Sequence, residues 1–138
     1  MGDRVIRELS DALKDAVQGD ASAVSDIVGA SHASLKEAAH AIGTPLVVRR
    51  ASVIRILQEL LNGRTSPSAV QAWASLMRRG YVARAAEGPI ESIDIDYDQQ
   101  WEDGIAMVIS RLDEIGDVVD GEIDNAEAHE LLQSLGAQ

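Results

Sequence analysis

Carboxylates are the residues of this sequence with the most evident chemical potential, and one acidic stretch has part of the spacing of a calcium loop. In GDVVDGEIDNAEAHELL, placing Gly121 at the sixth loop position puts Asp120 at the fifth and Glu127 at the twelfth. An EF-hand loop also needs oxygen ligands at its first and third positions. A glycine and a valine stand there, so we expect no working metal site, although a degenerate EF-hand-like helical domain stays as one alternative.

A second acidic cluster, IDIDYDQQWED, fails the same test. Asp94, Asp96 and Asp98 could open a calcium loop. The sixth position would then be Gln99 and the twelfth Ile105, neither of which suits the loop. We therefore interpret both clusters as acidic surface.

Other patterns that carry chemistry are missing from the sequence. Its three histidines form no HExxH pair, and it contains no GxSxG, Walker or GxGxxG motif. The absence of cysteine removes disulfides, cysteine-based zinc sites and thiol catalysis. We expect no enzyme activity and no cofactor.

Charge is distributed unevenly along the chain. Residues 49–84 hold seven arginines and one glutamate, whereas residues 85–138 hold fifteen acids and one arginine, within a net charge of -11. The acidic last third argues against a nucleic-acid partner for that surface. It favours a basic protein partner, attracted over long range.

The arginine-rich segment 49–84 supports an alternative function. In SPSAVQAWASLMRRGY, Arg78 and Arg79 could contact phosphates from a recognition helix, which would make this a helical nucleic-acid-binding or regulatory protein. The other interpretation is that these arginines pair with acids of the same fold, and that the pair at the helix end also suits the helix dipole. We favour internal pairing.

The elements that must position these residues are mostly helical. Apolar residues recur at helical period from Val5 to Val17, and again up to Ile42 with Gly29 as an expected break. Further periodic stretches end at Asn62-Gly63 and at Gly80. Together with two C-terminal stretches, they predict an all-α, compact bundle of about six helices in a single domain, residues 1–138. We expect residues 84–97 to form an extended acidic loop rather than a strand.

No membrane segment is expected. No apolar run approaches the length of a membrane span, and the N-terminus has acids where a signal peptide has its apolar region. We expect a cytoplasmic protein that is a monomer or a homodimer.

Residues 53–135 also resemble a group of small acidic bacterial immunity proteins of toxin systems, including contact-dependent inhibition and colicin-type immunity relatives. Two motifs carry the likeness: a Leu-x-x-Gly helix end, and a Ser/Thr-initiated helix with Val-x-x-Trp-Ala. A DY before the next helix and a short closing helix complete it. The matching residues are Leu60, Gly63, Val70, Trp73, Ala74, Asp96, Tyr97, Leu131, Leu132 and Leu135.

The resemblance implies an immunity or antitoxin-like protein that occludes a basic toxin with an acidic surface. Charge complementarity would speed association and select the partner, while a few anchors would carry the affinity. Two acidic patches are candidates for this partner-binding surface, with Tyr97 as an aromatic at the rim or as an anchor. The candidate residues are Asp94, Asp96, Tyr97, Asp98, Glu102 and Asp103 in the first patch, and Asp113, Glu114, Asp117, Asp120 and Glu122 in the second.

Overall fold

The computed structural model describes residues 8–27, 32–80, 93–116 and 122–136. Within these ranges the chain forms six α-helices, two short 3-10 helices (η) and two short strands. In chain order they are α1 Leu9–Val17, η1 Ala21–Asp26, α2 His32–Ile42, β1 Leu46–Val48, α3 Arg50–Leu61, α4 Pro67–Arg79, β2 Ile95–Tyr97, η2 Gln99–Trp101, α5 Glu102–Asp113 and α6 Asn125–Ser134. The predicted helical fold class is confirmed.

The helix ends follow the local signals in the sequence. Ser66 caps α4 by accepting a hydrogen bond from the Ala69 amide at 3.2 Å, and Pro67 occupies the first turn. Gly80 ends α4 with a positive φ of 77°, a conformation that glycine adopts without steric cost. Asp124 caps α6 by accepting from the Glu127 amide at 2.8 Å. The expected end of this helical stretch at Gly80 is therefore confirmed.

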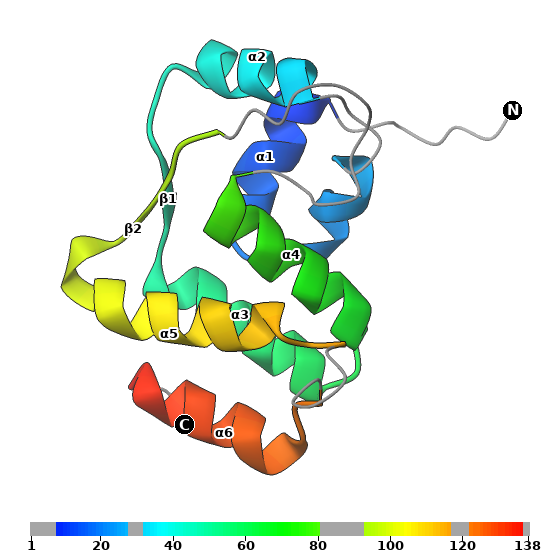
Figure 1. Ribbon diagram of the computed structural model, residues 1–138, viewed down its shortest axis with the longest axis vertical. Helices are drawn as coiled ribbons and strands as arrows, with labels where there is room; N and C mark the ends of the chain where they lie inside the picture. Colours follow the sequence, from blue (N-terminus) through cyan, green and yellow to red (C-terminus); the bar gives the residue numbers. More distant parts are fainter. Residues whose placement is uncertain (1–7, 28–31, 81–92, 117–121, 137–138) are drawn as a thin grey trace, which may run out of the picture.

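One apolar cluster joins the helices. Figure 1 shows α2 at one end of the molecule and α6 at the other, with α4 and α5 crossing between them. Trp73 lies fully buried in α4, and its indole Nε1 donates to the Ala16 carbonyl of α1 at 2.7 Å. A buried indole that keeps its hydrogen bond avoids a desolvation penalty, so this contact ties α1 to α4.

The sequence-based expectation for residues 95–97 was wrong, and the strand at Leu46–Val48 was not predicted. Ile95–Tyr97, expected to be loop, forms β2, which pairs in parallel with β1 in the register Leu46↔Ile95, Val47↔Asp96 and Val48↔Tyr97. The two strands run side by side along one flank of the molecule (Figure 1). Three residues cannot hold a strand without a partner, and that partner lies about fifty positions earlier in the chain. Only the folded chain brings the two together.

In the described ranges, no helix combines the length and the apolar character that a membrane crossing needs.

Candidate protein-binding surface

The first predicted acidic patch is largely on the surface. Asp94, Asp96, Glu102 and Asp103 are all exposed. In β2 the side chains alternate across the strand, so Ile95 and Tyr97 pack toward the core while Asp96 faces outward. In α5, Glu102 and Asp103 occupy the first turn, where the helix dipole favours negative charge.

Asp98 has a structural role between β2 and α5. Its carboxylate accepts a hydrogen bond from the Gln100 amide at 3.1 Å and so starts η2. The same carboxylate lies 3.8 Å from the Arg49 guanidinium, and 28% of its side chain is exposed. Asp98 therefore contributes less free charge to the surface than its neighbours do.

Tyr97 is half-buried and packs against the core. Its hydroxyl donates to the Met77 carbonyl of α4 at 3.4 Å. Burial raises the pKa of the Tyr97 phenol above its ordinary value, an effect that the Arg78 charge opposes and the Asp113 charge reinforces. Tyr97 anchors β2 on α4 and presents only part of its ring outward.

The expectation that Asp113 is a surface acid is wrong. Only 3% of its side chain is exposed. It accepts hydrogen bonds from Arg78 at 3.0 Å, from Arg79 at 3.5 Å and from the Gln71 amide at 3.0 Å. Each step along a helix turns a side chain by about 100°, which directs Asp113 onto α4 and leaves Glu114 on the outer side.

The spacing of α5 contained a signal for this burial. Asp113 follows the buried Ile105 and Ile109 at intervals of four residues, so all three lie on neighbouring parts of one helix face. A carboxylate at the border of an apolar face needs a partner from the adjacent helix. The two arginines at the end of α4 supply it.

Met107 is a surface residue that sequence interpretation did not select. It is 52% exposed, the single large apolar side chain so exposed among the described residues. Asp103 precedes it by four residues and Glu114 follows it by seven, so the three share the outer face of α5. We call these three residues the α5 stripe. Met107 was detectable in the sequence because it lies off the apolar periodicity of Trp101, Ile105, Val108 and Leu112.

Arg111 contacts two residues of the second predicted patch, Glu114 and Glu122. This arginine bonds both carboxylate oxygens of Glu127, approaches Glu114 at 3.0 Å and donates to the Glu122 carbonyl at 3.1 Å. Hydrogen bonding to Arg111 lowers the pKa of Glu127. Glu127, which the calcium-loop spacing places at the twelfth position, therefore joins α5 to α6 in this structure.

Of the other predicted residues of that patch, one is described by the structure and two are not. Glu122 is exposed. Asp117 and Asp120 lie outside the described residues. Across the described ranges, no three acidic or histidine side chains come close enough together to hold a metal ion.

Several arginines of segment 49–84 bond within the fold. Arg78 and Arg79 pair with Asp113, and Arg55 pairs with Glu59 at 3.3 Å. The guanidinium carbon of Arg50 lies 4.8 Å from the centroid of the Trp101 ring, and Arg50 donates to the carbonyl of Leu135, the C-cap of α6, at 2.7 Å. These contacts support the interpretation that the arginines serve the fold. Arg84 lies outside the described residues.

Comparison with known proteins identified no relative of this chain. No protein family, no curated protein and no solved structure matches this chain. The resemblance to immunity proteins therefore stays a prediction.

Proposed function

We propose that this protein acts by binding a basic protein partner through the α5 stripe and the neighbouring acids of β2 and the α5 start. The observation that carries the proposal is the exposed Met107 between Asp103 and Glu114 on one helix face. An exposed apolar side chain one turn from the exposed acids Glu102 and Asp103 is the arrangement expected of an interface in which one anchor supplies affinity and a charged rim selects the partner.

The electrostatics of the described residues support a basic partner. The arginines at the end of α4 are committed to Asp113, and Arg111 is committed to Glu127 and Glu114. Asp94, Asp96, Glu102 and Asp103 remain exposed, and within the described part of the chain none of them forms an ion pair. In a chain of net charge -11, these acids attract a basic surface and repel a phosphate backbone.

The resemblance of residues 53–135 suggests a specific form of this function, that of an immunity or antitoxin-like inhibitor. Such a protein would neutralise a basic toxin by covering the surface with which the toxin binds its substrate. This is a binding function without catalysis or cofactor.

Photo-crosslinking tests the proposal. A benzophenone amino acid replaces Met107 in the full chain, which is expressed in its native cells. We expect a crosslink to one basic protein that weakens as salt rises, because electrostatic association is screened. Charge reversal by Asp103→Lys together with Asp96→Lys should remove the crosslink.

The matched control is Glu37→Lys, which reverses an exposed charge on α2, outside the proposed surface. This variant should keep the crosslink. Equal crosslinking by the double variant and the control would contradict the proposal, as would recovery of nucleic acid alone. In the second case the arginine-rich segment would become the better candidate.

A further inference from the structure

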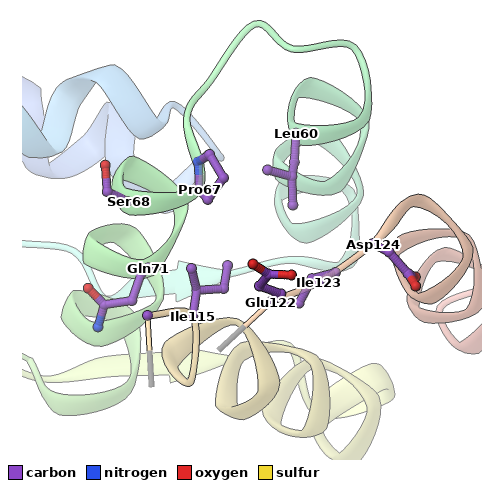
Figure 2. A pocket seen from close by; sticks show the side chains of 9 residues that line it. Leu60, Pro67, Ser68, Gln71, Ile115, Glu122, Ile123 and Asp124 are labelled. Carbon is purple, nitrogen blue, oxygen red and sulfur yellow. The ribbon is translucent and has the colours of Figure 1, made fainter. Parts of the chain in front are cut away.

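A cavity of about 610 Å³ lies where α3 and α5 end and α4 and α6 begin. Its apolar walls come from four separate segments: Leu60 of α3, Pro67 of α4, Ile115 after α5 and Ile123 before α6. Figure 2 shows these four side chains around one space. The cavity is distinct from the α5 stripe, because none of the three stripe residues lines it.

The volume and walls suit a small organic molecule. Ligand sites in proteins usually measure about 300 to 1,000 Å³ and combine apolar walls with a few polar groups. The four apolar side chains would cover a hydrocarbon or aromatic body. The polar groups then decide which chemical class of ligand fits.

The Glu122 carboxylate is a charged group in the cavity lining that a ligand can reach. Figure 2 shows it between Ile115 and Ile123. Among the described residues, no donor or cation bonds this carboxylate; Arg111 contacts only the Glu122 backbone carbonyl. The Asp124 carboxylate also lines the cavity, where its Oδ1 accepts from the Glu127 amide in capping α6 and its charge adds to that of Glu122. The Gln71 amide nitrogen is turned to Asp113.

The dipoles of the surrounding helices do not cancel the attraction of the Glu122 carboxylate for a cation. Two helix C-termini, which favour cations, and two N-termini, which favour anions, meet at the cavity. Both N-termini are capped by side chains, α4 by Ser66 and α6 by Asp124. No arginine or lysine of the described residues lines the cavity, and Arg64 lines only the adjoining one.

We propose that this cavity binds a small organic cation, an ammonium group on an apolar body, with the ammonium at Glu122. This function is separate from binding of a basic protein. It requires the Glu122 carboxylate and the four apolar walls, and it does not require Met107.

The test compares phenethylammonium with phenethyl alcohol, which share their shape and differ in charge. Titration of the purified full chain, followed through isoleucine methyl NMR shifts, should show saturable shifts for Ile115 and Ile123. The ammonium compound should bind up to about fivefold more tightly, the range of one partly exposed ion pair. Absence of saturable shifts at low-millimolar concentration, or equal affinity for the two probes, would overturn the proposal.

Two variants and a control locate the charge. Glu122→Gln should lower the affinity for phenethylammonium toward that for the alcohol. Ser68→Lys, at an exposed position on the cavity rim, should weaken only the ammonium compound. Glu130→Gln removes an exposed α6 carboxylate that does not line the cavity and should change neither affinity. If Glu130→Gln lost the preference for phenethylammonium over phenethyl alcohol, the ammonium would bind elsewhere. The same would hold if Glu122→Gln kept the full preference.

Discussion

The Asp113 carboxylate of α5 lies 3.0 Å from the Arg78 guanidinium of α4, while only 3% of the Asp113 side chain is exposed. A buried carboxylate is tolerated because Arg78, Arg79 and Gln71 satisfy it. This contact connects two helices whose packing forms much of the core.

Asp113→Ala should lower the free energy of unfolding by about 1 to 3 kcal/mol, because the Gln71 amide loses its partner and a small void opens. The loss stays moderate since both arginines are about half exposed and return to water. Urea denaturation measures it. Glu114→Ala, one residue along and on the outer face, should change stability by no more than about 0.5 kcal/mol. Equal effects of the two variants would show that the contact contributes nothing specific.

The Arg111–Glu127 pair should make stability depend on pH. The pKa of Glu127 is lower in the folded state than in the unfolded chain, because Arg111 stabilises the ionised form. The unfolded chain therefore binds more protons, and this contribution is complete above the ordinary glutamate pKa of about 4.3. It is lost as pH falls through the lower, folded-state pKa.

Urea unfolding of the protein and of Glu127→Gln, measured at several acidic pH values, isolates this contribution. The difference in stability between the two proteins should be largest near neutral pH and should shrink below the ordinary glutamate pKa. The other carboxylates titrate in both proteins, so their contributions to stability cancel in this difference. A difference that is constant with pH would contradict the assignment.

Arg50 should hold the C-terminal end of α6 in place. It stacks on Trp101 and donates to the Leu135 carbonyl at 2.7 Å. Arg50→Ala should cost about 1 to 2 kcal/mol and speed hydrogen exchange in α6. Arg50→Lys should restore little, because an ammonium lacks the planar face that stacks. Arg49→Ala is the neighbouring control, since Arg49 is 69% exposed and its ion pair is long. Equal α6 exchange in the two alanine variants would refute this role.

Gly19 should tolerate no side chain. Its φ is 95°, and a Cβ there would lie 2.5 Å from the Ser52 carbonyl oxygen of α3. Gly19→Ala should cost about 3 kcal/mol or more, since backbone strain and overpacking add. Gly43 has a φ of 72° but open space around it. Gly43→Ala should therefore cost only about 1 to 2 kcal/mol, and thermal unfolding compares the two. A cost at Gly19 no larger than that at Gly43 would exclude the close approach.

Much of the secondary structure was predictable because its determinants are local. Helical periodicity predicted a helix that ends at Gly80, and the structure has α4 there, with Val70, Trp73 and Met77 on its buried face. Charge counting also identified the acidic region, since composition requires no coordinates. The exposed position of Asp103 agrees with these two patterns, whereas the outward position of Asp96 depends on the alternation of side chains along β2.

Contacts between distant segments were decided only by the tertiary structure. The pairing of β1 with β2, the burial of Asp113 against α4 and the cavity at the ends of four helices each join residues far apart in the chain. The sequence by itself determined helix positions, caps and charge, because these depend on neighbours within a few residues. Which carboxylates stay free and which become partners of arginine depended on helix packing, because one step along a helix separates the buried Asp113 from the surface residue Glu114.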